Sequence, residues 1–476
     1  MTIHFFPSVL VLMLINISVS AETPSKNNQL QQVTLTETVF LQQVKRNHPV
    51  LELAYLKQET ASAQRLERQG AFDPVINASS AYKRFNSSAD LGRVQEVVDS
   101  QFSMEFLTRY GVRIRTGVNL AIGDIKTPIY PTGEGGEYYI DMTLPLFRGA
   151  GINPQMAQEN QAFLREGQTE HLLRQTELLL LPDALNHYWQ WVGASKKREV
   201  ERSLLEVAKF RANAVQQKID RGLLANILGI EAEQEVQIRL GRLYKADRDL
   251  QRTALKLAIF LWLDDLEPAL TPSPEQVPQL IANPQKYNLK ILAEGKQQAL
   301  FKRPEMQILD IAKSMAEIDQ QLAQNTLLPQ IDLFVTPGYQ VGQGAIDGGV
   351  EVMAGVSMSL PIYQRSAKGQ IEQARLAIEN LSIQERQIIR TIMLEIADQF
   401  SAVNTTFDRY QAAEQELDLA QQLENGEKTR FEYGDSTLFL VNRRERATGE
   451  AKLGLIDVLV EYHQAVAGFQ AATGKL

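Results

Sequence analysis

The sequence predicts a mainly helical protein that also forms a transmembrane β-barrel, built from two copies of one unit of strands and long helices. Three observations carry this prediction: an apolar N-terminus typical of export, a repeated pattern of prolines, and helical stretches too long for a globular core. Aromatic residues make up only 7% of the 476 residues, while Gln, Glu, Ala, Leu and Arg dominate long stretches. This composition is typical of extended helices that have one face in water.

The composition also argues against several function classes. The formal net charge is −8, from 49 basic and 57 acidic residues, whereas nucleic-acid binders usually carry a basic excess. Without cysteine the chain has no disulfide framework, thiolate zinc site or iron–sulfur cluster. Five histidines and no recognisable catalytic motif leave little material for enzyme chemistry. We therefore expect no enzymatic activity, no cofactor and no nucleic-acid partner.

Residues 1–21 predict a signal peptide. The segment is apolar and ends in Val-Ser-Ala at residues 19–21, with small side chains at the positions that signal peptidase requires. The alternative is an uncleaved anchor, but Pro7 and Asn16 interrupt the run, which is too short and broken for a span of about 20 residues. No later segment is apolar enough to cross a membrane as a helix, so any membrane insertion would have to come from strands.

A duplicated pattern organises the rest of the chain. Pro49 and Pro304 lie 255 positions apart, and so do Pro74 and Pro329. In each copy the two prolines enclose 24 residues of helical pattern, since proline is tolerated at a helix start and ends a helix elsewhere. A repeat period above 200 residues is too long for a solenoid. The pattern therefore indicates duplication of a whole architectural unit.

We predict two structural repeats, residues 22–263 and 303–476, joined by a proline-rich connector over residues 264–302. Each repeat starts with a short helix, continues in β sequence and closes with a long helical hairpin, over 155–263 or 363–473. The first arm of such a hairpin would be roughly 100 Å long at 1.5 Å per residue. No globular core requires helices of this length, so the helices predict a tube.

The β segments alternate between apolar and polar residues with a period of two. They cover residues 75–147 in the first repeat and the hairpin 331–360 in the second. Such runs are typical of outer-membrane strands and also of any half-buried antiparallel sheet. An exported chain with such long helices offers no obvious soluble layer to cover these strands, which favours a barrel. The first region holds four candidate strands: 75–85, 101–109, 112–122 and 137–147.

At these landmarks the sequence resembles the TolC-like outer-membrane efflux protein family, over essentially all of residues 34–474. The matching motifs are His48-Pro49, Leu144-Pro145-Leu146-Phe147, Arg221-Gly222, Leu360-Pro361-Ile362-Tyr363 and Tyr433-Gly434-Asp435-Ser436. The resemblance implies a homotrimer whose strands share one barrel and whose helices form a periplasmic tunnel. The family usually has two strands per repeat. The first repeat here has four, so either the barrel gains strands or a hairpin extends at one mouth.

The resemblance also implies a function. The protein would sit in the outer membrane of a Gram-negative bacterium and passively conduct substrates from the periplasm or an inner-membrane pump to the exterior, in a tripartite efflux or type I secretion system. Its partners would be outer-membrane lipid, a periplasmic adaptor and the pump. Two alternatives stay open: an exporter dedicated to secreted proteins, and a soluble periplasmic coiled-coil adaptor or scaffold. The sequence names neither the substrate nor the pump class.

Two glycine turns are where the resemblance places contacts with the adaptor. Glycine allows the tight reversal of each long helix, and Ser436 or Thr437 can cap the returning helix. The alternative is that the turns only reverse the chain. The candidate docking residues are Arg221, Gly222, Gly434, Asp435 and Ser436.

The helix after the second turn is where acidic residues often constrict the tunnel in this family. The corresponding stretch 438–445 reads LFLVNRRE, and Asp435 in the turn is the nearest acidic candidate before it. Three copies of Arg443 or Arg444 facing the lumen would instead form a cationic ring. Otherwise these arginines are solvated on the outer face. The candidate gate residues are Leu440, Arg443 and Arg444.

Overall fold

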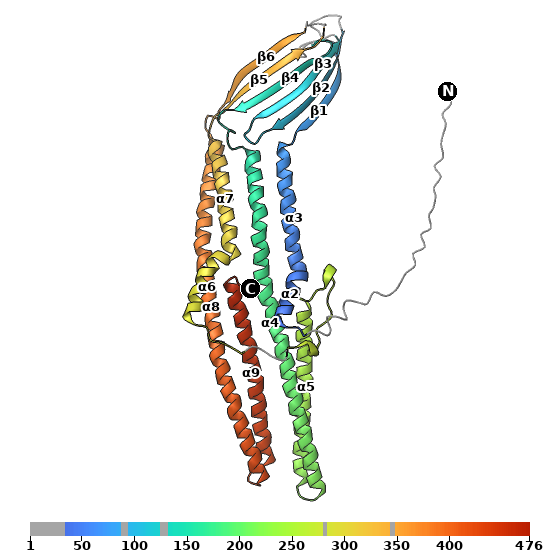
Figure 1. Cartoon of the computed structure of the whole chain (residues 1–476), viewed down its shortest axis with the longest axis vertical. Helices are drawn as coiled ribbons and strands as arrows, with labels where there is room; N and C mark the ends of the chain where they lie inside the picture. Colours follow the sequence, from blue (N-terminus) through green and yellow to red (C-terminus); the bar gives the residue numbers. More distant parts are fainter. Residues whose placement is uncertain (1–33, 87–93, 124–131, 279–282, 343–347) are drawn as a thin grey trace, which may run out of the picture.

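The computed structural model describes residues 34–86, 94–123, 132–278, 283–342 and 348–476. These residues form a long rod of helices with a single β-sheet at one end (Figure 1). The predicted signal peptide, residues 1–21, lies outside the described residues. Within the described ranges, no helix is both long and apolar enough to span a membrane.

Two very long helices run the length of the rod. Helix α4 (Pro154–Asp220) has 67 residues and α8 (Arg365–Glu432) has 68, which corresponds to about 100 Å each. Both start beside the sheet and turn back at the opposite end into shorter helices, α5 (Asn226–Ala258) and α9 (Leu438–Ala472). The helices occupy the ranges in which the sequence predicted the two helical hairpins, 155–263 and 363–473.

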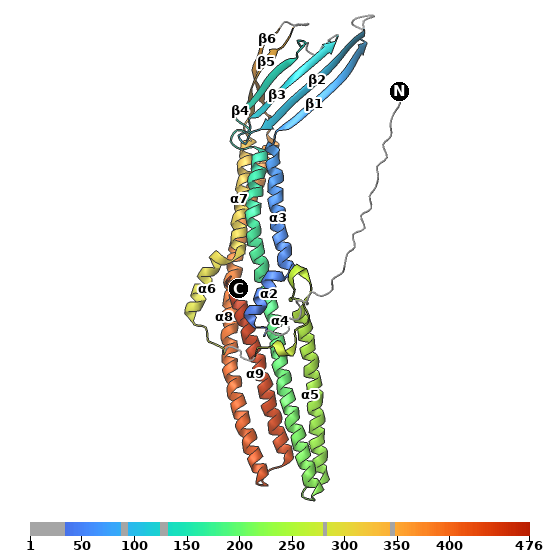
Figure 2. The ribbon, with the colours of Figure 1, turned by 45° about the vertical axis from the view of Figure 1, so that its right-hand side comes forward.

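Short helices complete the half of the rod nearer the sheet. Helix α3 (Pro49–Gln69) packs on α4, and α7 (Pro304–Asn325) packs on both α4 and α8. Figures 1 and 2 show that these two flank the upper halves of the long helices, as α5 and α9 flank the lower halves. Both start with proline at the first helical position, where its missing N–H is not needed. The remaining helical elements are α2 (Glu37–Asn47), η1 (Gly70–Phe72), η2 (Asp264–Leu266), η3 (Pro274–Gln276) and α6 (Leu289–Lys302).

The last third of the predicted connector (residues 264–302) is helical. Helix α6 occupies residues 289–302 and is capped by Asn288, whose side chain accepts a hydrogen bond from the Ile291 N–H at 3.0 Å. The five prolines of the connector all lie before residue 285, so nothing in the second part prevents a helix. Ala299 is fully buried in a cluster with residues of α8 and α9, which gives α6 its packing surface.

The sheet contains six antiparallel strands whose order follows the chain. The four strands of the first repeat and the two of the second meet where β4 pairs with β5, for example at Thr143 opposite Phe334. The second strand starts at Val94 rather than at 101 as predicted, because its first half is too polar to be recognised as a strand. The strands are β1 (Val75–Asn86), β2 (Val94–Leu107), β3 (Arg113–Gly123), β4 (Glu137–Pro145), β5 (Gln330–Gln340) and β6 (Gly349–Ser359).

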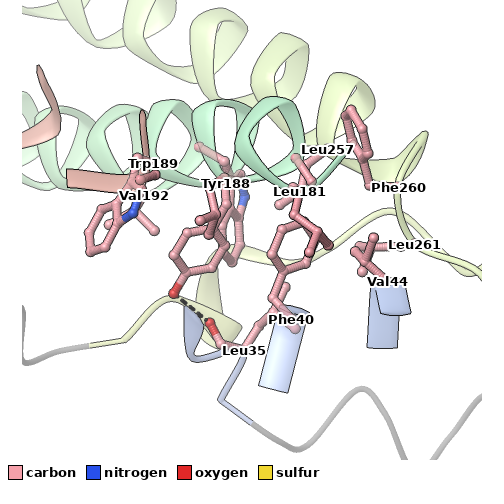
Figure 3. Close-up of a cluster of buried hydrophobic side chains, with 14 of the residues drawn as sticks. Leu35, Phe40, Val44, Leu181, Tyr188, Trp189, Val192, Leu257, Phe260 and Leu261 are labelled. Carbon is pink, nitrogen blue, oxygen red and sulfur yellow. Dashed lines mark hydrogen bonds between the residues drawn. The ribbon is translucent and has the colours of Figure 1, made fainter. Parts of the chain in front are cut away.

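The main hydrophobic core lies in the middle of the rod, where α2 and the C-terminal end of α5 pack against α4. The Phe40 ring stacks on Tyr188 with centroids 5.2 Å apart, and the Tyr188 hydroxyl donates a 2.9 Å hydrogen bond to the Leu35 carbonyl (Figure 3). Burial raises the pKa of the Tyr188 hydroxyl, so it stays protonated and remains a donor. Trp191 and Leu257 are fully buried in the same cluster. We call this cluster the middle core.

Candidate functional site at the helix tips

The turn between α4 and α5 lies at the end of the rod opposite the sheet. Gly222 adopts a left-handed backbone conformation, with φ of +71°. The Leu223 N–H donates to the Lys218 carbonyl at 2.9 Å, and the Gly222 N–H donates to Ile219 at 2.8 Å. This pair of hydrogen bonds is a Schellman motif, which uses carbonyls that the helix end would otherwise leave without partners.

The turn between α8 and α9 repeats this geometry. Gly434 has φ of +81°, the Asp435 N–H donates to Arg430 at 2.9 Å, and the Gly434 N–H donates to Phe431 at 3.1 Å. The two turns therefore end their long helices in the same way. Figure 1 places both at the same end of the rod. For both glycines a side chain would require the same left-handed backbone, which non-glycine residues rarely adopt.

Polar side chains around Gly434 pair with the preceding helix. Thr437 caps α9 by accepting a 3.4 Å hydrogen bond from the Leu440 N–H. Ser436 instead donates to the Glu427 carboxylate at 2.5 Å, and Asp435 accepts from Arg430 at 3.1 Å. Of the two predicted capping residues, Thr437 is therefore the cap.

Most of the predicted docking residues are accessible. Arg221, Gly222, Gly434 and Asp435 are exposed, and Ser436 is half-buried. The Asp435 carboxylate remains largely open to solvent despite its ion pair with Arg430.

A stripe of exposed apolar side chains at the first tip was not predicted from the sequence. Leu223, Ile227 and Ile230 are 68%, 66% and 67% exposed. Ile227 and Ile230 are three positions apart and share one side of the start of α5, and Leu223 lies in the turn just before this helix. Tyr433 and Phe439 are exposed at the other tip. The spacing in LLANILGI could have revealed the stripe, but it reads equally well as the buried face of a helix. We call these five residues the tip stripe.

The three candidate gate residues differ in their exposure and in their charged partners. Leu440 is half-buried, while Arg443 is exposed and takes part in none of the ion pairs found among the described residues. The Arg444 guanidinium lies 3.7 Å from the Glu427 carboxylate of α8. Arg444 therefore has an anionic partner within its own chain, whereas Arg443 has none among the ion pairs of the described residues.

A buried carboxylate next to these arginines joins three helices. Glu445 of α9 accepts two hydrogen bonds from the Arg211 guanidinium of α4, one of them 2.5 Å long, and lies 3.1 Å from the Lys428 ammonium of α8. Burial alone would raise the pKa of the Glu445 carboxyl. The hydrogen bonds and charges of Arg211 and Lys428 outweigh burial and hold that pKa below its usual value. Glu445 is therefore ionised at neutral pH.

A second buried carboxylate joins α5 to α9. Glu235 accepts hydrogen bonds from the Arg239 and Arg446 guanidiniums, both with N–O distances of 2.9 Å. The side chains of Glu235 and Arg239 are almost completely buried. The hydrogen bond to Glu235 raises the pKa of Arg446. We call Arg211, Glu235, Arg239, Lys428, Glu445 and Arg446 the tip network.

The tip network could not be found by motif reading, since Arg211 and Glu445 are 234 positions apart and Glu235 and Arg446 are 211 apart. Its ion pairs and hydrogen bonds connect neighbouring helices, so its geometry indicates a role in holding these helices together. Within the ranges that the structure describes, no three His, Asp or Glu side chains gather as a metal site.

Comparison with known proteins agrees with this architecture. Residues 296–475 match the family model described as outer membrane efflux protein. No curated protein matches the chain significantly.

Solved structures match over nearly the whole chain. A membrane protein from Pseudomonas aeruginosa has 17% identity and a TM-score of 0.66, with 97% of this chain and 96% of that chain covered. The CmeC outer membrane channel of Campylobacter jejuni has 13% identity and a TM-score of 0.64, covering 98% and 94%. The MtrE outer membrane channel of Neisseria gonorrhoeae, in its open state, has 14% identity and a TM-score of 0.63, covering 98% of both chains.

These likenesses establish the fold, and the match of residues 296–475 covers the second repeat, with its β-hairpin and long helical hairpin. The chain thus has the fold of the outer-membrane channels to which it is compared, and its residues 296–475 match the outer membrane efflux protein family.

Proposed function

We propose that the protein is a homotrimeric channel that passively conducts substrates across the periplasm and the outer membrane, from an inner-membrane pump to the exterior. The observation that carries this proposal is the combination of helices about 100 Å long with one sheet at their end whose outer face is mostly apolar. A sheet of this kind is stable in lipid when it closes on itself. One copy has only six strands, so closure requires further copies.

The helix tips are the proposed docking surface for a periplasmic adaptor. The tip stripe exposes five large apolar side chains at the end farthest from the sheet. Exposed apolar clusters on a folded chain usually mark interaction sites. A helical hairpin of the adaptor, with its own apolar side chains, fits such a stripe by helix packing. Arg221 and Asp435 would supply polar contacts at the rim of this surface.

The tip network and Arg443 together form the proposed gate. The network holds α4, α5, α8 and α9 together through buried charges, and opening of the tunnel would require these helices to separate. Arg443 would line the entrance in three copies and favour anions electrostatically.

Fractionation of cells that express the full chain tests the channel proposal. We expect trimers in the outer-membrane fraction that need detergent for extraction and dissociate on heating. A monomer extracted without detergent would contradict the proposal and favour the soluble scaffold.

Affinity capture of a purified periplasmic adaptor of an efflux system tests the docking surface. Ile227→Glu is expected to abolish capture, because it puts a charge in the centre of the apolar stripe. Tyr244→Glu on the same helix is the matched control, since Tyr244 is 64% exposed but lies away from the tip. Equal capture by both variants would exclude the tip stripe as the docking surface.

A further inference from the structure

The first repeat contributes one hairpin more to the sheet than the second. Between α3 and α4 the chain forms four strands, and between α7 and α8 it forms two. All six strands lie side by side in one sheet (Figure 2), and the strand order follows the chain from β1 to β6. We call β1 and β2 the extra hairpin. Because it lies in the same sheet, it widens the sheet instead of extending it at one mouth.

One face of the sheet is mostly apolar across all six strands, and polar members in β1 and β2 pair with one another, Ser80 with Ser100 and Arg84 with Glu96. Residues that are paired directly in neighbouring strands share a face, and one such row can be followed from edge to edge. It reads Ala78, Phe102, Val118, Tyr138, Tyr339 and Val350. Every member of the row is apolar or aromatic, and Phe102, Tyr138, Tyr339 and Val350 are more than half exposed. This is the pattern of a lipid-facing surface, and the extra hairpin shares it.

The opposite face is polar across the same strands. The adjacent row reads Ser79, Gln101, Asn119, Glu137, Gln340 and Gly349. On this face Lys83 pairs with Asp99 at 2.6 Å, which ties β1 to β2. Gln101 of β2 donates to the Tyr139 hydroxyl of β4 at 3.2 Å, reaching across Gly117 of β3. These side-chain contacts connect the extra hairpin to the rest of the sheet on its polar face.

The two edges of the sheet are complementary. β1 leaves the helices at Val75 and β6 returns to them at Ser359, so the two edge strands run in opposite directions. In the described part of the chain, β1 pairs only with β2 and β6 only with β5. Both edge strands are exposed along almost their whole length, whereas the central strands β3 and β5 are mostly half-buried. In lipid an open edge would leave its backbone groups without hydrogen-bond partners.

We propose that β6 of one copy pairs antiparallel with β1 of the next, and that three copies of six strands close a barrel of 18 strands. The inference rests on the homotrimer of the proposed function and adds the strand number and the pairing edge. Barrel diameter grows roughly linearly with strand number, so this barrel is about 1.5 times as wide as one with four strands per copy. Barrels of 16–18 strands enclose a water-filled channel. The outer exit therefore admits bulkier substrates than the four-strand arrangement.

Cysteine cross-linking tests the pairing, because the natural chain contains no cysteine. Ser79→Cys in β1 is combined in turn with Met353→Cys, Ser357→Cys and Ser359→Cys in β6, all on the polar face. A disulfide forms only between side chains that lie close together in register. The series therefore scans the register between β1 of one copy and β6 of the next. On oxidation of the purified trimer we expect one pair to shift from monomer to covalent dimer and trimer in a denaturing gel.

Two controls fix the interpretation. Ser79→Cys with Gln101→Cys joins neighbours within one chain, so oxidation must leave the chain monomeric in the gel. Asn119→Cys in the central strand β3, combined with the same β6 cysteines, must not link copies. Cross-linking of β3 but not of β1 to the neighbour would overturn the proposal and indicate a 12-strand barrel with the extra hairpin outside it.

Strand counting by electron microscopy of the wild-type trimer provides a second readout that does not depend on any variant. Eighteen strands are expected, and twelve would overturn the inference. A trimer with twelve strands leaves the proposed channel function intact. Absence of a trimer from the outer membrane contradicts the proposed function itself, so the two failures are distinguishable.

Discussion

The middle core and the helix tips are held together by different forces. In the middle core, large apolar and aromatic side chains such as Phe40, Tyr188 and Trp191 are buried almost completely. At the tips the apolar clusters are small, and the buried contacts between helices include the carboxylates of Glu235 and Glu445 with their arginines. Hydrophobic burial is insensitive to pH, whereas paired charges respond to it. The tips can therefore loosen while the middle core stays closed.

The largest expected effect on stability comes from truncating a large side chain of the middle core. Trp191→Ala deletes a side chain with no solvent exposure and should destabilise the protein by about 3–5 kcal/mol. The thermal unfolding temperature of the purified protein measures this. Phe210→Ala, at a residue of the same helix that is 79% exposed, serves as the control and should change little. Equal melting temperatures would mean that the middle core does not dominate stability.

The next effect concerns the tip network. Glu445→Gln keeps the shape of the side chain but removes the charge that Arg211 and Lys428 share, at a cost of about 1.5–3 kcal/mol. We expect faster hydrogen exchange at residues 438–450 and greater channel conductance. Exchange at residues 181–192 of the middle core should not change. A loss of protection in both regions would show that the two regions are coupled and do not loosen independently.

Acidification should imitate this substitution. The pKa of Glu445 is lowered in the folded protein, so its stabilising contribution is fully present above the ordinary value of 4.5 and is lost as the pH falls through the lower, folded value. Protection of residues 438–450, corrected for the intrinsic pH dependence of exchange, should therefore fall below about pH 4.5. In Glu445→Gln this component of the decrease should be absent. Its persistence would assign the pH response to another group.

A smaller effect is expected from the hydrogen bond inside the middle core. Tyr188→Phe removes the bond to the Leu35 carbonyl and keeps the stacking on Phe40, so the cost should be about 1 kcal/mol. The unfolding temperature at neutral pH checks this value. A loss as large as that of Trp191→Ala would show that the polar contact, and not burial, anchors α2.

The smallest effect on stability is expected at Arg443. Arg443→Ala changes an exposed side chain and should alter the free energy of unfolding by less than about 0.5 kcal/mol. Planar-bilayer recordings should instead show a reduced preference for anions. Unchanged anion-to-cation selectivity would reject the cationic ring and leave Arg443 as a solvated outer-face residue.

Local chemistry explains what could be predicted from the sequence. Proline at the start of α3 and α7 and glycine at residues 222 and 434 act on their own turn of backbone, so they mark helix starts and reversals reliably. The function class followed from the order of these landmarks. The sequence pattern also located four candidate strands between residues 75 and 147.

Contacts between distant residues explain what could not be predicted. The place of the extra hairpin depends on which strands pair, and alternation within a strand does not decide that. Each buried carboxylate has one partner from another helix more than 200 positions away, Arg211 for Glu445 and Arg446 for Glu235. Leu223, Ile227 and Ile230 of the tip stripe are spaced by four and three residues, but only the fold shows that their side chains are exposed.

The attachment of the sheet to the helices has a consequence for how such proteins can evolve. α3 enters and α4 leaves the first β region on the same side, as α7 and α8 do in the second. Each strand reverses the chain, so only an even number of strands returns it to that side. An insertion of one strand would send α4 away from the rod, while an inserted hairpin leaves every helix in place. The exit of this architecture can thus enlarge by whole hairpins, without any compensating change in the helices or the tips.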